Sequence, residues 1–336
     1  MFVLFSFYKD LNKIDMTKKN HYFIFIMFVI FTISNAQEWI NVSPIIDEYC
    51  VLLGNFISEE EGWIIQMNLN GEPIYHTSDG AETWEIISTE EDSLGAKKML
   101  HMINENLGWL ITTRGSDYQY YKTSDGCHHW EDMTIQISHL IHESLSSFFF
   151  LNQDVGFIAG RDSVSYTYTI HKTINGGYDW YETTIPVIVG GEYITNIFFI
   201  NEMHGWATGS YFASLGYCLY TSDGGENWEI LIEPGNVEFW DIHFLNNTKG
   251  GIAGRNSNQS VILITDNNFE TILFNHNIYD IELFASTICF QNENTIWIAG
   301  EPGKVNRSTN GGESFELYQI LEASGYVHNK SEQLDH

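Results

Sequence analysis

The sequence contains few basic residues. Its 336 residues include 15 lysines and arginines against 44 aspartates and glutamates, which gives a net charge of −29. Nucleic acids and anionic membrane surfaces bind proteins through clusters of Lys and Arg. We therefore expect no nucleic-acid partner, and we interpret most of the acidic residues as a solubilising surface.

Long hydrophobic runs are also scarce. One apolar run covers residues 22–33, follows Lys18 and Lys19, and ends at Ser34-Asn35-Ala36. It is too short to span a membrane, and its order of charged, apolar and small residues is typical of a secretory signal peptide. We predict that residues 1–36 are a signal peptide, with Met16 as an alternative start. The protein would then be exported to the periplasm, the cell surface or the medium, with no membrane span in the mature chain.

Cysteine is rare, and the common site motifs are missing. The four cysteines have no C-x-x-C spacing and no Cys/His cluster, so we do not predict structural zinc. An even number in an exported chain permits disulfides, but scattered positions favour buried thiols. The sequence lacks a D-x-D-x-D-G calcium loop, a G-x-S-x-G motif and a glycine-rich phosphate loop. We expect no metal and no cofactor. The cysteines are Cys50, Cys127, Cys218 and Cys289.

A short segment recurs along most of the chain. The segment at residues 221–228 (TSDGGENW) has similar copies at 77–84 (TSDGAETW), 123–130 (TSDGCHHW), 173–180 (TINGGYDW) and 308–315 (STNGGESF). A degenerate copy lies at 265–270 (TDNNFE). Counted at the Asp or Asn position (79, 125, 175, 223, 266 and 310), the steps are 46, 50, 48, 43 and 44 residues. A period in the forties indicates a repeat architecture.

A second motif recurs in phase with the first. It reads F-x-N-x-x-x-G-W-x-x-G and has its clearest copies at 199–209 (FINEMHGWATG) and 150–160 (FLNQDVGFIAG). Each unit thus holds four short runs rich in β-branched and aromatic residues, separated by Gly, Asn, Asp and Ser, a pattern typical of four antiparallel strands. Six such units predict an all-β, six-bladed β-propeller over residues 37–320, with seven blades as the alternative.

The ends of the repeat region carry two further expectations. Residues 39–44 resemble the fourth strand of a unit and could pair with the last blade near residues 315–320, which would close the ring. The polar residues 321–336 are expected to form a disordered tail. We expect a monomer.

These motifs resemble known repeats. The S/T-x-D-x-G-x-x-W segment is similar to the Asp box, or bacterial neuraminidase repeat, of sialidases, sortilin-type receptors and several glycoside hydrolases. The combined pattern, over about residues 39–320, looks most like the photosystem II assembly and stability factor family and its secreted bacterial relatives. The resemblance implies a propeller that binds a partner and is not an enzyme; its photosynthetic role is not carried over, because this chain is too acidic.

The conserved positions of the repeat are interpreted as structural. The short carboxylate or amide would accept backbone N–H groups in the turn between the third and fourth strands, glycine would adopt positive φ, and tryptophan would pack between blades. Asn in two copies supports this, because an amide cannot act as a general acid. The residues concerned are Asp79, Asp125, Asn175, Asp223, Asn310, Trp84, Trp130, Trp180 and Trp228.

The few basic residues suggest a binding face. With the first strand innermost, the loops after the second strand emerge opposite the repeated turns, around the mouth of the central channel. We expect Lys97 and Lys98 in a loop preceding a first strand on this same face. Guanidinium groups bind carboxylates, and aromatic residues in these loops would add contact area. The alternative is that these charges only pair with nearby acids. The candidate ligand-binding residues are Arg114, Arg161, Arg255, Lys304, Tyr168 and Trp240.

Three functions follow from these observations. The first is a secreted, non-enzymatic module that binds a protein or glycan partner. The second is a sialidase-like hydrolase, which needs an arginine triad, a tyrosine nucleophile paired with glutamate, and an acid/base aspartate; the chain lacks the F/Y-R-I-P motif of that family. The third is another Asp-box glycoside hydrolase that uses two carboxylates. Similar xyloglucanases use two propeller domains, and this chain has material for one, so we expect no catalytic residues.

Overall fold

All regular elements in the described part of the chain are β-strands. The computed structural model describes residues 52–66, 73–87, 94–115, 117–134, 141–162, 167–186, 193–211, 215–256, 259–278, 284–301, 304–321 and 327–329. These residues form 25 strands in six antiparallel sheets, each following the order of the sequence.

Each sheet is one blade, whose strands we call a to d from first to last. Blade 1 contains β1 (Leu52–Phe56), β2 (Gly62–Gln66), β3 (Ile74–Thr77) and β4 (Glu85–Ile87). Blade 2 contains β5 (Ala96–Met102), β6 (Gly108–Arg114), β7 (Asp117–Thr123) and β8 (Glu131–Asp132). Blade 3 contains β9 (Ile141–Phe150), β10 (Gly156–Asp162), β11 (Tyr168–Thr173) and β12 (Tyr181–Glu182).

The second half of the chain continues the pattern. Blade 4 contains β13 (Tyr193–Phe199), β14 (Gly205–Tyr211), β15 (Leu215–Thr221) and β16 (Glu229–Gly235). Blade 5 contains β17 (Glu238–Phe244), β18 (Gly250–Asn256), β19 (Gln259–Thr265) and β20 (Phe274–Ile278). Blade 6 contains β21 (Phe284–Phe290), β22 (Ile296–Glu301), β23 (Lys304–Ser308), β24 (Glu316–Leu321) and β25 (Val327–Asn329).

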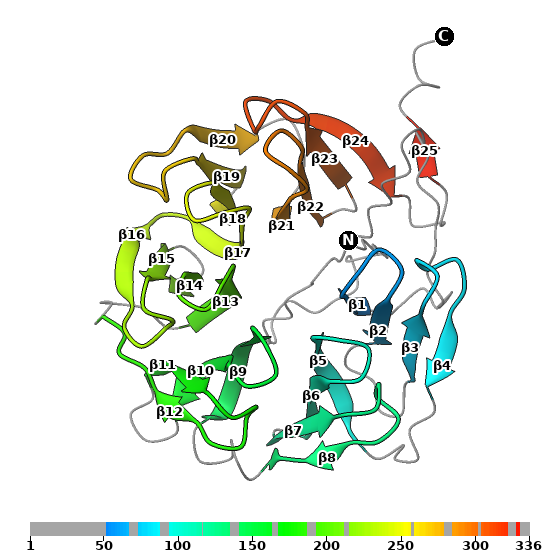
Figure 1. Ribbon diagram of the computed structural model, residues 1–336. Helices are drawn as coiled ribbons and strands as arrows, with labels where there is room; N and C mark the ends of the chain where they lie inside the picture. The colour runs from blue at the N-terminus through cyan, green and yellow to red at the C-terminus, as the bar shows by residue number, and fades with distance from the viewer. Residues whose placement is uncertain are drawn as a thin grey trace.

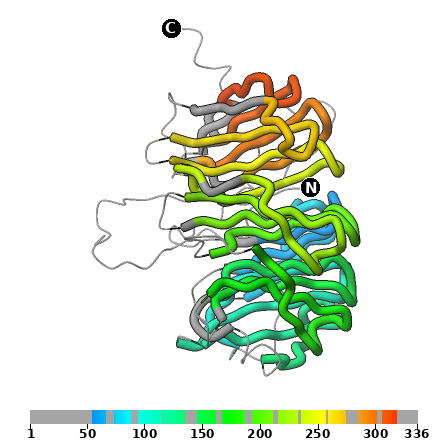
Figure 2. Tube along the Cα trace, turned by 90° about the vertical axis from the view of Figure 1, so that its left-hand side faces the viewer, coloured from blue at the N-terminus to red at the C-terminus, as the bar shows by residue number. Residues whose placement is uncertain are grey.

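The six blades are arranged in a ring around a central axis, with strand a innermost (Figure 1). The prediction of a six-bladed propeller is confirmed, and the seven-bladed alternative is wrong. Seen from the side, the strands run between two faces (Figure 2). We call the face that carries the a–b loops and c–d turns the turn face, and the face with the b–c and d–a connections the opposite face.

Aromatic stacking joins neighbouring blades. The last residue of strand a stacks on an aromatic residue of strand b in the preceding blade: Phe150 on Trp109 with ring centroids 3.5 Å apart, and Phe244 on Trp206 at 3.7 Å. Both tryptophans are fully buried. Trp228 of blade 4 contacts Phe157 of blade 3 edge-on, with ring centroids 6.5 Å apart, so it packs in the space between blades. Buried aromatic pairs of this kind contribute about 0.5–1.5 kcal/mol each beyond their area.

One hydrogen-bonding scheme shapes the c–d turns. In blade 4 the Thr221 hydroxyl donates to Asp223 Oδ1 (2.8 Å) and accepts the N–H of Gly225 (2.9 Å). Asp223 Oδ1 also accepts the N–H of Asn227 (3.0 Å). Gly224 and Gly225 have φ of 75° and 81°, where glycine avoids a steric penalty.

In the turn of blade 5, the Asp position of the repeat is one residue later than the sequence analysis placed it. There Thr265 donates its hydroxyl to Asn267 Oδ1 (3.0 Å), so Asn267 and not Asp266 occupies the Asp position. The hydroxyl selects the residue two places after it. The Asp position is therefore read from the threonine and not from the nearest carboxylate.

Each c–d turn is also attached to the a–b loop of its own blade. The N–H three residues after the turn Thr or Ser donates to a carbonyl of that loop at 2.8–2.9 Å in all six blades. The donors are Gly80, Gly126, Gly176, Gly224, Asn268 and Gly311.

The ends of the chain lie mostly outside the described residues. The predicted signal peptide, the expected closing strand at 39–44 and Cys50 all fall there. In the segment expected to be a disordered tail, β25 pairs antiparallel with β24, with Ile320 opposite His328. Cys127, Cys218 and Cys289 are buried and free of disulfides.

Candidate functional site

The innermost strands of blades 2 to 6 share one irregularity near the opposite face. In each, a single residue is skipped in the pairing with strand b, which is a β-bulge, and β9 has a second irregularity nearer its start. Bulges bend a strand and re-aim a side chain, and they are common beside binding sites. The skipped residues are Lys98, Ser146, Thr195, Trp240 and Ser286. Between Phe239 and Asp241, which pair with Gly254 and Ala253, Trp240 has no pairing partner in β18.

Trp240 belongs to a three-residue cluster in blade 5. Arg255 lies over the indole, with its Cζ 4.5 Å from the ring centroid. Its Nε donates to Glu238 Oε2 at 2.9 Å, and the indole N–H donates to the same oxygen at 3.1 Å. The Glu238 residue is 5% exposed and the Arg255 side chain 36% exposed. A buried carboxylate therefore fixes the guanidinium of a partly exposed arginine side chain in one orientation.

Tyr168 belongs to a second group, which spans blades 2 to 4. It pairs with Arg161 across β10 and β11, and its ring meets Tyr193 edge-on at 5.6 Å. Tyr217 donates its hydroxyl to the Tyr193 carbonyl at 3.2 Å. Burial raises the pKa of Tyr118 and of Tyr217, and the neighbouring Tyr168 raises both further. These tyrosines are therefore neutral hydrogen-bonding groups at neutral pH.

The remaining basic candidates are placed separately. Arg114 is exposed at the end of β6, and Lys304 begins β23. The expectation that Lys97 and Lys98 lie in a loop is wrong, because both are in the inner strand β5. Lys97 is buried, and burial lowers the pKa of Lys98. The aliphatic stem of a lysine can pack in a sheet while its ammonium group stays at a polar surface. Charge alone therefore does not place a lysine in a loop.

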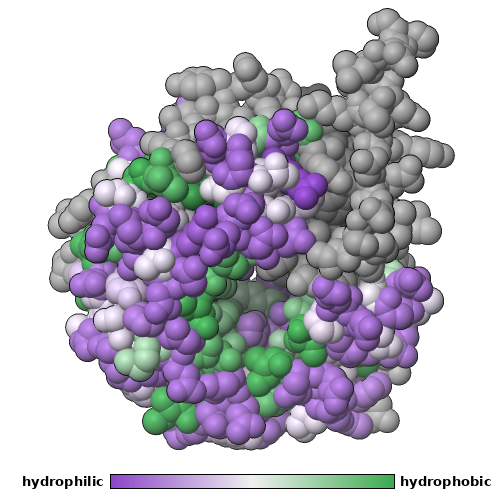
Figure 3. Space-filling model, turned by 45° about the horizontal axis from the view of Figure 1, so that its top comes forward, coloured by the Kyte–Doolittle hydropathy of each residue, from purple (hydrophilic) through white to green (hydrophobic). Residues whose placement is uncertain are grey.

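The inner strands around the central opening carry two histidines that the sequence analysis did not single out. Figure 3 shows a hollow centre with hydrophobic residues around it and a mostly hydrophilic outer surface. The inner strands bring His243 to 5.0 Å from Phe198, and His101 to 5.3 Å from Phe149, measured between ring centroids. Burial lowers the pKa of both histidines to about 4, so both are neutral at neutral pH. Both histidines lie one residue before the first residue of the F-x-N motif, and this shared position could have identified them in the sequence.

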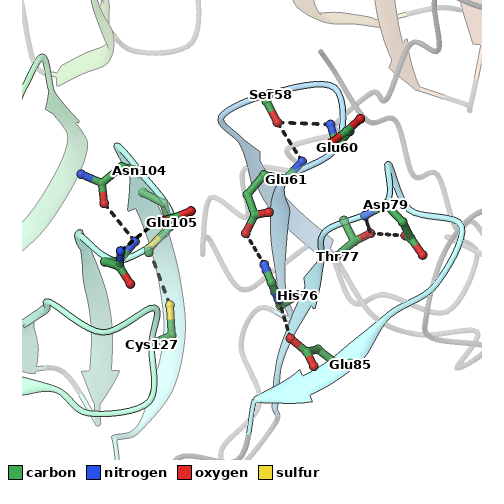
Figure 4. A network of polar contacts seen from close by, with 12 residues as sticks. Ser58, Glu60, Glu61, His76, Thr77, Asp79, Glu85, Asn104, Glu105 and Cys127 are labelled. Atoms are coloured by element: carbon green, nitrogen blue, oxygen red, sulfur yellow. Dashed lines mark hydrogen bonds and ion pairs between the residues drawn. The ribbon is translucent and has the colours of Figure 1, made fainter.

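The turn face holds several tyrosine–carboxylate and histidine–carboxylate pairs. Figure 4 shows His76 between two glutamates: its Nδ1 is 2.7 Å from Glu85 Oε1 and its Nε2 2.5 Å from Glu61 Oε1. Tyr181 donates to Glu226 Oε1 at 2.9 Å, and burial together with this contact raises the pKa of Tyr181 to about 12. No group of three His, Cys, Asp or Glu residues within the described ranges is arranged to hold a metal ion. None of the described elements is a helix long and apolar enough to cross a membrane.

Comparison with known proteins identifies the fold alone. No protein-family model and no curated protein sequence matches the chain. Among solved structures, it is similar to YCF48 from Cyanidioschyzon merolae (TM-score 0.59, 17% identity, 79% of this chain and 83% of that one). It is equally similar to a YCF48 bound to a D1 peptide (TM-score 0.58, 17% identity, 79% and 80%).

A glycoside hydrolase shares the fold as well. The GH74 xyloglucanase from Xanthomonas campestris matches with a TM-score of 0.59 at 7% identity, over 76% of this chain and 44% of that enzyme. This chain therefore spans less than half of the hydrolase.

Proposed function

We propose that this protein is an exported, non-enzymatic propeller that binds a partner through its opposite face, and that the partner is a protein segment with an exposed carboxylate. The observation that carries the proposal is the Arg255 guanidinium, held by Glu238 and Trp240 with part of its surface exposed. A fixed guanidinium loses little entropy on binding a carboxylate and can do so with two parallel hydrogen bonds.

The tyrosine group extends the same surface. Tyr168 and Tyr193 are half-buried and in contact, and aromatic residues of this kind supply rigid contact area at protein interfaces. The structure of a YCF48 with a bound D1 peptide supports a polypeptide ligand for a propeller of this shape. The Asp-box resemblance and the predicted signal peptide support the assignment to secreted relatives of that fold. N-terminal sequencing that begins at Gln37 would test export.

The hydrolase alternatives have weaker support. A sialidase-like nucleophile would be a tyrosine whose pKa a neighbouring group lowers. In the Tyr181–Glu226 pair the pKa of the tyrosine is raised, and the pair lies on the turn face. On the opposite face Glu238 accepts bonds from arginine and indole, which leaves it unsuited to proton transfer to a substrate.

Binding by purified protein comprising residues 37–336 tests the proposal. The probes are a peptide library with free C-terminal and side-chain carboxylates, the same peptides amidated, and a glycan array with a hydrolysis screen. We expect carboxylate peptides to bind, and Arg255→Gln to weaken binding at least tenfold, about 1.4 kcal/mol.

The matched control is Arg307→Gln. Arg307 lies over Trp297 with its Cζ 4.9 Å from the ring, the same arrangement as in the cluster, but on strand c next to the turn face. It should leave binding unchanged. Equal binding of amidated peptides, or turnover of any glycan, would contradict the proposal, whereas glycan binding without turnover would replace the protein partner by a carbohydrate.

A further inference from the structure

The c–d turn of blade 3 differs from the other five in one exposed residue. The residue after the turn Thr or Ser is small or polar in five blades: Ser78, Ser124, Ser222, Asp266 and Thr309. In blade 3 it is Ile174, which is 61% exposed. Since the turn forms equally well with serine, the isoleucine contributes nothing that the fold requires.

Three neighbouring positions also carry a larger and more hydrophobic residue than most of the other blades do. Tyr178 stands where the other copies have Glu82, His128, Glu226, Glu270 and Glu313. Tyr181 stands where four copies have Glu85, Glu131, Glu229 and Glu316. Met203, in the a–b loop of blade 4, stands where the others have Glu60, Asn106, Asp154, Thr248 and Asn294, and it is 51% exposed.

Hydrogen bonds connect the elements that carry these residues. Tyr181 donates to Glu226 in the blade 4 turn at 2.9 Å. The carbonyl of Met203 accepts the N–H of Gly224, in that same turn, at 2.9 Å. Ile174 and Tyr178 belong to one turn of blade 3. We call Ile174, Tyr178, Tyr181 and Met203 the blade 3–4 patch.

The surroundings of the patch are acidic. Exposed carboxylates lie on the same turns, loops and strand ends: Glu131, Asp154, Asp179, Glu182, Glu202 and Glu226. The two nearby lysines are already engaged. Lys172 is buried and bonded to Glu226 at 2.6 Å, and Lys122 lies under the Tyr178 ring at 4.8 Å.

We propose that the blade 3–4 patch is a second docking surface, which binds a cationic polypeptide segment that carries apolar side chains. Exposed apolar residues gathered within a polar rim mark interaction sites, and tyrosine and methionine are enriched there. A carboxylate rim attracts Lys and Arg and repels acidic surfaces. A second copy of this chain, with a net charge of −29, is therefore a poor occupant. This surface is on the turn face and does not depend on the function proposed for the opposite face.

The test is fluorescence anisotropy with a labelled peptide of alternating lysine and leucine. We expect binding that weakens with added salt and that falls at least fivefold in Ile174→Ser/Met203→Asn, two changes to residue types that other blades carry. Ile86→Ser is the matched control, because Ile86 is also 61% exposed but lies on β4 of blade 1. It should leave binding unchanged.

Two further probes separate the apolar and electrostatic contributions. Oligolysine of equal charge and a glutamate–leucine peptide should both bind more weakly than the lysine–leucine peptide. Equal binding of either peptide, an equal loss in Ile86→Ser, or no loss in the double variant would overturn the proposal. So would a concentration-dependent dimer, seen by analytical ultracentrifugation, that the double variant abolishes, since the occupant would then be a second copy.

Discussion

At the scale of single residues, each c–d turn depends on a matched pair four positions apart. The Oδ1 atom of the first residue accepts a backbone N–H of the turn. Its other terminal side-chain atom forms a hydrogen bond with the side chain four residues later. Asp223 Oδ2 accepts from Asn227 Nδ2 at 2.8 Å, and in blade 3 the polarity reverses, with Asn175 Nδ2 donating to Asp179 Oδ2 at 2.8 Å. Where the partner is Asn or Asp, it therefore sets the choice between Asp and Asn, whereas a hydroxyl partner pairs with either, as in Asp79–Thr83 and Asn267–Thr271.

This reversal makes Asn175→Asp destabilising. The new carboxylate would face Asp179 and would replace a hydrogen bond with a like-charge contact, so we expect a loss of about 1–2 kcal/mol in the free energy of unfolding. The second change Asp179→Asn should restore stability, because it reproduces the blade 4 pair. Asn310→Asp is the control, since its partner Ser314 can donate its hydroxyl instead. Urea denaturation compares the natural protein with these three variants. A double variant no more stable than Asn175→Asp would refute the pairing.

The sequence predicted the chemistry of these turns but not all of their backbone. Positive φ was expected at glycine, yet Ala81 and Cys127 adopt φ of 72° and 74° at the position of Gly225, and Phe269 adopts 58°. The hydrogen bond from each N–H to the turn hydroxyl holds these residues in a conformation that their own side chains disfavour. A pattern based on glycine could not anticipate this.

At the scale of elements, side chains of the inner strands link neighbouring blades from blade 1 to blade 6. Asn55 accepts the N–H of Met102 at 2.7 Å, His101 donates to the Phe150 carbonyl at 2.8 Å, and Ser147 accepts the N–H of Ile197 at 3.1 Å. His243 accepts the N–H of Phe290 at 3.3 Å. The inner strands thus form a continuous polar chain through the described blades.

Asp241 is the most connected member of this chain. It accepts from Asn196 in blade 4 (2.6 Å), and from the Thr287 hydroxyl (2.6 Å) and Ile288 N–H (2.9 Å) in blade 6. Asp241→Ala would leave these donors without their acceptor, and we expect a loss of about 3–5 kcal/mol. Thr287→Val removes one donor and should cost about 1 kcal/mol. Equal stability of Asp241→Ala and the natural protein in guanidinium titrations would show that water replaces the carboxylate.

Strand positions could be predicted from periodicity, whereas site geometry could not. The motif F-x-N-x-x-x-G-W located the end of strand a and the start of strand b in every blade. It could not show that Glu238 is buried beneath Arg255, because a glutamate at a strand end is usually exposed. Nor could it show the bulges, which depend on the pairing of two strands and leave no fixed residue type: Lys98, Thr195 and Trp240 occupy the same place.

At the scale of the whole molecule, the ring encloses two neutral histidines. His101 and His243 lie on the inner strands of blades 2 and 5, three blades apart in a six-bladed ring (Figure 1). Each completes a link to the next blade in its neutral form, and burial lowers the pKa of both to about 4. The contacts between blades 2 and 3 and between blades 5 and 6 therefore depend on the protonation state of these histidines.

This coupling predicts a loss of stability in mild acid. The unfolded chain binds protons at these histidines below an ordinary pKa of 6.5, whereas the folded ring resists protonation until about pH 4. The free energy of unfolding should hence be unaffected above pH 6.5 and fall as the pH drops towards 4, by up to about 3 kcal/mol for each histidine. Thermal unfolding measured from pH 7.5 to 4 follows the change.

Variants separate these two histidines from the many other ionisable groups. His101→Gln retains a donor for the Phe150 carbonyl, and His243→Asn retains an acceptor for the Phe290 N–H, so the double variant should fold and its stability should vary less between pH 6.5 and 4. His128→Gln, at an exposed position on the blade 2 turn, should leave the pH profile unchanged. An unaltered profile in the double variant would mean that the centre of the ring is hydrated enough for its histidines to titrate normally.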